Sequence, residues 1–447
     1  MHREAMEDLR RWADSPRRKP LVVTGARQVG KTWLVLEFGR EHYDAVAHVT
    51  FLDNEVMKGV FAGSLEPNRL LAAISAYTGT DASSGKVLVF LDEIQECPRA
   101  IASLKQLYED RPDVPVIAAG SLLGVAMNRS ATSRNAQERV SWPVGKVDYL
   151  DMHPMTFREF VSAVGQPRLA QLLRADSLEL ACAMGEKYDD LLRLYLYTGG
   201  MPEAVQAYLD TNLLAESRKV QLRLLHDYEF DFSKHVAVPV ESERIREVWR
   251  SVPTQVSRES GINKFVYSKI KAGGRGREYR DAVSWLVDAG LVTRVSRVSR
   301  PGIPLLSHAD ERSFKLFLLD VGLLGAAYGL DQDIVLHGDA LYAQGKGAYA
   351  EQYVCQQLVA SSACVPYYWS ADGRTEKGEV DFLYECRGKV VPLEVKSDDN
   401  VRSRSLAKFA KQYGIERCQR LSRRGYKDEG WLVNLPLFAA NVLPALL

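Results

Sequence analysis

Eight consecutive residues near the amino terminus have the composition and spacing of a phosphate-binding loop. The pattern G-x-x-x-x-G-K-[ST] is matched by Gly25, Ala26, Arg27, Gln28, Val29, Gly30, Lys31 and Thr32. Glycines let such a loop curl so that its backbone N–H groups point at phosphate oxygens, and the helix that follows adds the positive end of its dipole. We expect Lys31 to reach the β- and γ-phosphates of ATP and the Thr32 hydroxyl to ligate Mg²⁺.

The most apolar strand predicted in the chain ends in two acids. Val87–Leu91 runs directly into Asp92 and Glu93. Two carboxylates at the end of a buried strand are costly unless they face a cleft or a cation, and ligands bind at the carboxyl edge of a parallel sheet. We expect Asp92 to hold Mg²⁺, usually through water, and Glu93 to polarise the attacking water, which predicts a hydrolase. For Glu93 the alternative is a solvated strand end.

A serine and three arginines are further candidates for the same reaction. Ser121 ends the next predicted strand, where it could contact the γ-phosphate or the attacking water, or could cap a helix. The sequence does not decide between these two roles. An arginine from a neighbouring copy would complete the site if the protein assembles, and the candidates are Arg129, Arg134 and Arg139.

A second group of charged residues lies near the carboxyl terminus. Glu394 and Lys396 are two residues apart on a predicted strand, so they share a face. If the preceding hairpin turns at Arg387–Gly388, Asp381 lies directly opposite Glu394. Like charges placed opposite each other destabilise a hairpin, so we expect a cation between them, with Lys396 pointing at the same spot. Glu351, on the preceding helix, could supply a further carboxylate.

An acid opposite a Glu-x-Lys resembles the signature of the PD-(D/E)XK nuclease fold. There the carboxylates bind Mg²⁺ and the lysine steadies the nucleophile or the transition state. This chain has Glu379-Val380-Asp381 where the name of the motif has Pro-Asp. The alternatives are strands with solvated outer faces, in which Lys396 pairs with Glu379 or Glu394, and a retained fold without activity.

The first third of the chain must form the sheet that positions the phosphate-binding loop. Apolar runs without polar alternation, separated by helices, predict a parallel sheet covered on both faces. A helix is expected from Lys31 to Arg40, directly after the loop. The predicted strands are Pro20–Gly25, His48–Asp53, Lys86–Glu93 and Val114–Ser121.

The middle of the chain reads as helical and then basic. Helices are expected from about residue 154 to 232. Three more helix-like pieces, at 244–252, 264–270 and 277–290, are followed by a strand, and together they span about 241–300. Nine basic residues against three acids lie between Lys264 and Arg300. Helix, helix, helix, strand fits a winged helix whose third helix could enter a DNA groove, with Arg277 and Arg280 facing solvent. The alternative is a winged helix that serves only for packing. The apolar face of that third helix is predicted from Tyr279, Ala282, Val283 and Leu286.

The last 110 or so residues read as a separate α/β unit. Helices are expected at Lys346–Leu358 and Ser403–Tyr413, with strands between and after them. Ten basic residues against three acids lie between Lys396 and Lys427, next to the proposed metal site, where a phosphate backbone would lie. A solvated helix face is the alternative.

Composition sets outer limits on these interpretations. The chain has 447 residues, a net charge of +1, 46% hydrophobic and 26% charged residues, which excludes collagen, a coiled-coil rod and wholesale disorder. At about 150 residues a domain, the length predicts roughly three domains. The six cysteines form no C-x-x-C pair, and the charged amino terminus lacks the apolar core of a signal peptide. We expect a cytoplasmic protein without a membrane span.

Several segments together resemble bacterial and archaeal AAA-family P-loop ATPases that carry a C-terminal domain of unknown function. These are GARQVGKTWLV, FLDEIQECP, SLKQLYE, AAGSLLGVA, SWPVGKVDYLDMHPMTFREF, LYLYTGGMPEAV, GEVDF and VPLEVKS. The resemblance implies an α/β multidomain protein: a P-loop ATPase core at 1–160, a helical lid at 161–235, a winged-helix-like domain at 236–330 and a restriction-endonuclease-like α/β domain at 331–447. It implies no known substrate.

Two functions are compatible with this organisation. The first is an ATPase, using ATP and Mg²⁺, that couples nucleotide state to a C-terminal module that binds DNA and could also cut it. The second is an ATP-dependent molecular switch that binds a protein partner or a second copy of itself, with a catalytically inactive nuclease-like fold. Both require ATP to bind at Lys31.

Overall fold

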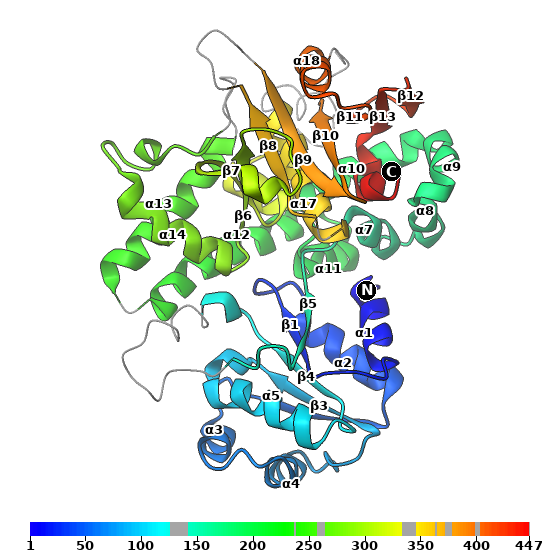
Figure 1. The fold of residues 1–447 in the computed structure, drawn as a ribbon. Coiled ribbons are helices and arrows are strands. Elements are labelled where there is room, and N and C mark those ends of the chain that lie inside the picture. The colour runs from blue at the N-terminus through cyan, green and yellow to red at the C-terminus, as the bar shows by residue number, and fades with distance from the viewer. Residues whose placement is uncertain are drawn as a thin grey trace. The chain divides into compact units, whose positions relative to one another are not determined.

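The computed structural model describes residues 1–125, 142–236, 238–256, 264–332, 346–362, 364–371, 378–397 and 403–446 (Figure 1). The chain divides into two compact units. The N-terminal unit comprises Met1–His153 with Asp288–Gly290, and the C-terminal unit comprises Pro154–Val287 with Leu291–Leu447.

In the described part of the N-terminal unit, five parallel strands form a sheet in the order β2-β3-β4-β1-β5. Three of the four predicted strands lie where expected, and β2 lies three residues earlier than predicted. The edge strand β5 was not predicted, because its side chains alternate between exposed and half-buried and so form no apolar run. The bounds are Leu21–Thr24 for β1, Ala45–Thr50 for β2, Val87–Asp92 for β3, Val116–Ala119 for β4 and Asp148–Asp151 for β5.

Helices cover both faces of this sheet, as the uninterrupted apolar strands predict. Alternate side chains of β3 point to opposite faces: Val87, Val89 and Leu91 join the core beneath α3, α4 and α5, whereas α2 packs on the other face against β2, β3 and β4. The helices are α1 (Ala5–Ala13), α2 (Lys31–His42), α3 (Glu55–Ala62), α4 (Pro67–Thr78), the 3₁₀ turn η1 (Ile94–Glu96) and α5 (Pro98–Asp110).

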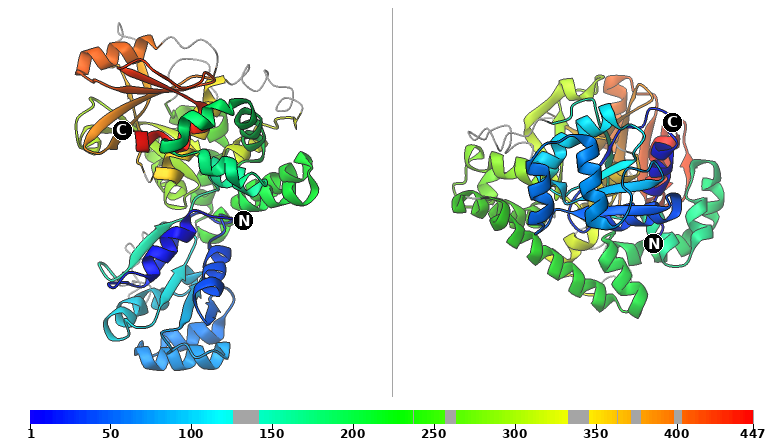
Figure 2. Two further views of the ribbon diagram at one scale, coloured as in Figure 1. Left: turned by 90° about the vertical axis from the view of Figure 1, so that its right-hand side faces the viewer. Right: turned by 90° about the horizontal axis from the view of Figure 1, so that it is seen from below.

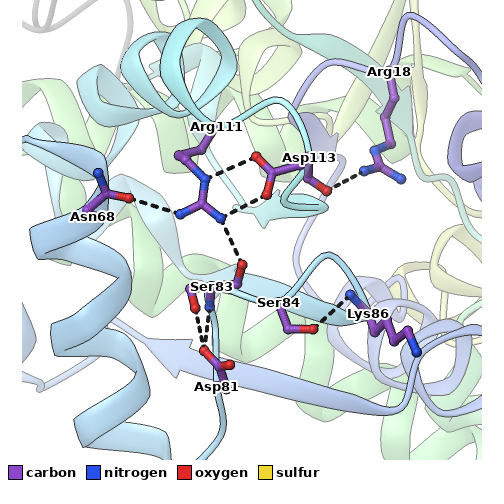
Figure 3. Close-up of polar contacts among 8 residues, drawn as sticks. All are labelled: Arg18, Asn68, Asp81, Ser83, Ser84, Lys86, Arg111 and Asp113. Carbon is purple, nitrogen blue, oxygen red and sulfur yellow. Dashed lines mark hydrogen bonds and ion pairs between the residues drawn. The ribbon is translucent and has the colours of Figure 1, made fainter.

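Arg111 ties together the loops at the amino-terminal edge of the sheet (Figure 3). Its guanidinium donates to both carboxylate oxygens of Asp113, at 3.0 and 2.8 Å, and to the Ser83 carbonyl at 2.8 Å. It also donates to the side chain of Asn68 on α4, at 3.0 Å. Arg18 donates to the Asp113 carbonyl at 3.1 Å. The loops that enter β3 and β4 are therefore fixed at the edge opposite the carboxyl ends of the strands.

In the described part of the C-terminal unit, eight strands form a second sheet in the order β12-β13-β11-β10-β9-β8-β6-β7. Strand β6 pairs in parallel with β8, so the sheet continues across the domain boundary predicted at residues 330 and 331. The bounds are β6 (Val292–Val298), β7 (Ala309–Leu318), β8 (Tyr367–Ser370), β9 (Glu379–Cys386), β10 (Lys389–Val395), β11 (Cys418–Ser422), β12 (Lys427–Asp428) and β13 (Leu432–Pro436).

The hairpin of β9 and β10 has the predicted turn and register. Arg387 and Gly388 have φ of 48° and 73°, which is the positive pair of a type I′ turn. Residues pair from Lys389 with Cys386 to Leu393 with Phe382. The paired residues end one step before Asp381 and Glu394, so the opposition of these two acids stays a prediction.

Helices flank the second sheet on both sides (Figure 2). Helix α18 packs on one face, and α17 with the 3₁₀ segment η5 packs on the other. The remaining bounds are α7 (Phe157–Ala163), α8 (Pro167–Leu172), η2 (Ala175–Ser177), α9 (Leu178–Ala183), α10 (Gly185–Thr198), α11 (Pro202–Thr211), α12 (Leu214–His235), α13 (Pro239–Val256), η3 (Tyr267–Lys269), α14 (Gly276–Asp288), η4 (Leu305–His308), α15 (Val321–Ala327), α17 (Lys346–Ser362), α18 (Arg404–Tyr413) and η5 (Leu437–Leu446).

One predicted helix is wrong. The segment from Lys264 to Ile270 contains only the short turn η3. Its backbone donors are already used: the Phe265 N–H bonds to the Phe314 carbonyl at 2.7 Å, and the Val266 N–H bonds to the side chain of Gln255 at 2.8 Å. This segment therefore hydrogen-bonds to Phe314 on β7 and to Gln255 instead of forming a helical turn.

A buried carboxylate joins three parts of the C-terminal unit. Asp320 is fully buried and accepts hydrogen bonds from the Gly200 N–H at 2.6 Å, the Leu323 N–H at 3.1 Å and the Gln356 amide at 3.0 Å. Burial raises the pKa of Asp320 above its usual value. A Cβ at Gly199, where φ is 67°, would lie 2.1 Å from a carboxylate oxygen of Asp320. Glycine is therefore required directly after α10, because a side chain at position 199 would collide with the Asp320 carboxylate.

We expect Gly200→Ala to destabilise the C-terminal unit by roughly 3 kcal/mol or more. The new Cβ would lie 2.2 Å from the Met155 carbonyl oxygen, which is backbone and cannot turn aside. Urea denaturation of the full chain measures the effect. The matched control is Gly185→Ala, whose Cβ would meet its nearest atom at 3.9 Å. Equal midpoints for the two variants would contradict the prediction.

Candidate functional site

The predicted phosphate-binding loop has the curled backbone that its sequence requires. It connects β1 to α2, and φ is positive at Gly25 (133°), Gln28 (68°) and Gly30 (93°). A Cβ at Gly25 would lie 2.2 Å from the Met152 carbonyl oxygen. Glycine is therefore needed there for its conformation and for the space. The helix α2 begins at Lys31, so its free N–H groups open onto the loop.

Lys31 lies over its own loop. Its ammonium donates to the Gly25 carbonyl at 3.0 Å and to the Ala26 carbonyl at 2.7 Å. Burial lowers the pKa of Lys31 to about 8, although the carboxylates of Glu93 and Asp92 oppose that shift. A cation with a lowered pKa at the mouth of an amide-lined loop can bind anionic phosphate.

Two of the predicted Mg²⁺ ligands already touch each other. The Thr32 hydroxyl donates to the Asp92 carboxylate at 2.9 Å. Hydroxyl and carboxylate oxygens are the donors that Mg²⁺ prefers, so these residues fit that ion. The same carboxylate lies 3.5 Å from Nε2 of His48, whose ring stacks on Phe90 with centroids 4.8 Å apart.

The structure also brings Ser121 and Glu93 together. Ser121 Oγ donates to a Glu93 carboxylate oxygen at 3.4 Å and accepts from Arg27 Nε at 3.3 Å. This contact follows from the strand order, because β4 lies between β1 and β3 and carries Ser121 to the space between the loop and the acids. Glu93, directly after β3, has φ of 49°, and Leu122, three residues after β4, has φ of 59°, so the backbone is strained close to the end of both strands.

Three residues at this edge were not predicted from the sequence. Arg3 is 5% exposed and donates to the Val29 carbonyl at 2.8 Å and to the His153 carbonyl at 2.6 Å, which supports the loop from behind. Gln95 donates to the Glu93 carboxylate, and His48 faces Asp92. Arg3 and His48 lie in none of the quoted segments, and Gln95 lies in FLDEIQECP, but the sequence gave none of the three a role at the site. The arginines predicted to act from a neighbouring copy, Arg129, Arg134 and Arg139, lie outside the described residues.

A lysine occupies the acidic cluster of the C-terminal unit. The ammonium of Lys315, on β7, lies 2.6 Å from a Glu379 carboxylate oxygen and 3.0 Å from a Glu351 carboxylate oxygen. Burial lowers the pKa of Lys315, but the carboxylates of Glu351, Glu379 and Asp381 together raise it above its usual value. Burial raises the pKa of Glu351 to about 7. Lys315 was not predicted, because the sequence gives no reason to join it to this site.

The other residues of the predicted nuclease-like site also have protein partners. Asp381 accepts a hydrogen bond from the Val395 N–H at 2.8 Å. Lys396 lies 2.8 Å from Glu394, which is one of the pairings predicted for it. Within the described ranges, no group of three or more His, Cys, Asp or Glu side chains could hold a metal ion. The carboxylates predicted to bind a second metal ion, Glu351, Asp381 and Glu394, therefore do not fit one in this arrangement.

Three family models match parts of the chain. Residues 17–161 match an AAA domain. Residues 189–334 and 346–438 match two domains of unknown function, DUF8612 and DUF4143. The N-terminal unit thus contains an AAA-type P-loop domain, as the resemblance implied. The nuclease-like and winged-helix-like interpretations of the rest stay predictions.

The chain has only distant similarity to whole proteins of known structure. No curated protein matches the chain significantly. Among solved structures, the chain is similar to a Walker-type ATPase of Pyrococcus abyssi, with 14% identity, a TM-score of 0.44, and coverage of 73% of this chain and 95% of that one. It is also similar to the ORC1 protein of Aeropyrum pernix in complex with DNA, with 14% identity, a TM-score of 0.29, and coverage of 74% and 93%. Likeness at this level assigns no activity or partner to this chain. No helix in the described ranges is long and apolar enough to cross a membrane.

We expect the affinity for ATP to fall as the pH rises above about 8. Phosphate binds the charged form of Lys31, whose pKa is lowered by burial to about 8. Above that pH a growing fraction of Lys31 must take up a proton on binding, so Kd rises by up to about tenfold per pH unit. Calorimetric titration at pH 7, 8 and 9 measures this change. Lys31→Arg keeps its charge and should give a flat profile. A constant Kd for the unaltered chain would contradict the prediction.

Proposed function

We propose that the chain hydrolyses ATP and uses the nucleotide state to control a DNA-binding C-terminal unit. The observation that carries the first part is the convergence of Lys31, Thr32, Asp92, Glu93 and Ser121 at one edge of a parallel sheet, with Thr32 and Asp92 2.9 Å apart. This convergence joins an anion-binding loop to an acid pair in the place where a phosphoanhydride would lie.

Each residue has a role that its position supports. The amides of the loop and Lys31 bind the phosphates, and Thr32 and Asp92 hold the metal ion. Mg²⁺, when bound, neutralises charge that develops on the phosphate oxygens. Glu93 orients and polarises the attacking water, and Ser121 holds the Glu93 carboxylate in place. The strained backbone at Glu93 is typical of a functional position.

DNA binding is supported by the basic surface around α14. The helix buries Tyr279, Ala282, Val283 and Leu286, the set predicted from the sequence, and leaves Arg277 and Arg280 exposed. Nearby exposed cations are Lys264, Lys269, Lys271 and Arg275. Such a surface can neutralise several phosphates of a nucleic-acid backbone.

A second basic face lies on α18. Arg404, Lys408 and Lys411 recur at the spacing of one helical face and are exposed, whereas Leu406 and Phe409 are buried against the sheet. The basic residues around this helix do not all contribute, because Arg420 is buried and donates to the Asn434 side chain at 2.8 Å.

The alternative function is a switch that binds a protein partner through an inactive nuclease-like fold. The ion pairs of Lys315 with Glu351 and Glu379 favour the absence of nuclease activity in either case. The two functions differ only in the partner, so a DNA-binding measurement distinguishes them.

We expect Lys31→Ala to abolish measurable ATP binding, because it removes the cation that faces the phosphates.

Glu93→Gln should keep ATP affinity and lower kcat by about 100-fold or more, since the base that polarises water is lost. Ser121→Ala should lower kcat by about tenfold through loss of the contact with Glu93. Phosphate release and calorimetry measure these effects. Glu109→Gln, an exposed acid on α5 that pairs with Lys146 at 2.9 Å, is the control and should change neither value. Unchanged ATP binding by Lys31→Ala would refute the nucleotide site.

We expect Arg277→Glu/Arg280→Glu to weaken binding to double-stranded DNA by about tenfold or more and to reduce the salt dependence by about two phosphate contacts. Fluorescence anisotropy over a salt series measures both. The control is Lys187→Glu/Lys219→Glu, which changes the net charge equally at exposed lysines elsewhere in the same unit. Absence of binding by the unaltered chain at low salt, with and without ATP, would remove DNA as the partner.

A further inference from the structure

Strand β7 carries a lysine into the interior of the C-terminal unit. Lys315 is 1% exposed, and its ammonium lies 5.1 Å from the centroid of the Tyr368 ring. A buried ammonium is strongly unfavourable unless it is paired and hydrogen-bonded. The partners of Lys315 therefore decide what this part of the unit can do.

Three carboxylates from two other elements surround this ammonium. Glu379 and Asp381 share one face of β9, and Glu351 comes from α17. The contacts to Glu379 and Glu351 are 2.6 and 3.0 Å, and Asp381 adds a further electrostatic attraction. With Lys315 in place, the described acids form no group that could hold a metal ion. Removal of the ammonium would leave the acids of one helix and one strand to repel each other unless a divalent cation came between them.

Helix α17 cannot easily withdraw Glu351 from Lys315. The neighbouring Gln352 accepts from the Leu318 N–H at 2.9 Å and donates to the Leu318 carbonyl at 2.6 Å. Its side-chain amide therefore makes the two backbone hydrogen bonds that a neighbouring strand would make with β7. Gln356, one turn later, accepts from the Val321 N–H at 2.9 Å. The helix is thus fixed along the strand that carries Lys315.

The Lys315 ammonium opposes the binding of a metal ion among the same acids. Mg²⁺ needs near-octahedral oxygen ligands at about 2.0–2.1 Å. The Lys315 ammonium already lies within 3.0 Å of two of the acids, and it would repel a second cation placed among them. The remaining acid of the predicted nuclease-like site, Glu394, lies 2.8 Å from Lys396.

We propose that the ammonium of Lys315 takes the place of a divalent cation among Glu351, Glu379 and Asp381, so that the C-terminal unit holds its partner without metal-dependent cleavage. The lysine is an internal counterion that preserves the fold of a metal-dependent site without its chemistry. This inference does not depend on ATP hydrolysis, which takes place in the other unit.

Titration of the full chain with Mn²⁺, followed by electron paramagnetic resonance without nucleotide, tests the proposal. The chain carries Asp92→Asn, which removes the acid that would hold a metal ion beside Thr32. With Lys315 present we expect no tight Mn²⁺ site. With Lys315→Met, which keeps the length of the side chain and removes its charge, we expect one new site and a rise of several degrees in Tm on adding Mn²⁺. The control Lys427→Met breaks an exposed ion pair with Glu429 and should gain no site.

Three results would contradict the role proposed for Lys315. It fails if the chain with Lys315 intact binds one Mn²⁺ tightly and Asp381→Asn removes that binding. It also fails if the unaltered chain nicks plasmid DNA with Mg²⁺ and Asp381→Asn abolishes the nicking, or if folded Lys315→Met gains no Mn²⁺ site. If Lys315→Met does not fold, Lys315→Met/Glu379→Gln is titrated in its place, because it removes one uncompensated acid together with the lysine.

Discussion

A charge that leaves water must find a partner, and this constraint shapes both units. In the C-terminal unit Lys315 is neutralised by Glu351 and Glu379, and α17 is held in place to keep them together. In the N-terminal unit Lys31 and Asp92 are buried too, but their hydrogen-bond partners are loop carbonyls, a hydroxyl and a backbone N–H, with the His48 ring 3.5 Å from Asp92. Hydrogen-bond partners that carry no charge leave charge available for a ligand, whereas the charge of Lys315 is neutralised by carboxylates beside it. The same physical requirement therefore supports an open site in one unit and a closed one in the other.

The order of the five-stranded sheet determines the chemistry of the N-terminal unit. Strand β4 lies between the strand that enters the loop and the strand that ends in the acids. Ser121 consequently reaches both Arg27 and Glu93, at 3.3 and 3.4 Å. Arg3 donates to the loop carbonyl of Val29, and Gln95 donates to the Glu93 carboxylate, so both help to fix the site. A rigid parallel sheet can hold such groups within hydrogen-bonding distance, because its strand ends are set by the whole core.

The C-terminal unit is continuous where the sequence indicated separate domains. The β6–β7 hairpin extends the sheet of the last hundred residues, and Asp320 joins the glycine pair after α10 to α15 and α17. A division at 235 and 330 would separate residues that share one buried hydrogen-bond network. Composition and periodicity report what each segment forms locally, so they cannot reveal that a basic helical segment and a later α/β segment complete the same core.

The sequence by itself determined whatever depends on neighbours along the chain. It located the phosphate-binding loop, the acids after β3, the buried face of α14, and the turn and register of the β9–β10 hairpin. It did not determine β5, whose exposed edge gives no apolar run, or the extended backbone around Phe265, whose donor is taken by a residue about fifty positions away. Only the tertiary structure decided that Arg3 supports the loop and that Lys315 fills the acidic cluster. Both act through ion pairs or hydrogen bonds across long stretches of chain, and the strength of such contacts depends on distance and burial, which residue order alone does not specify.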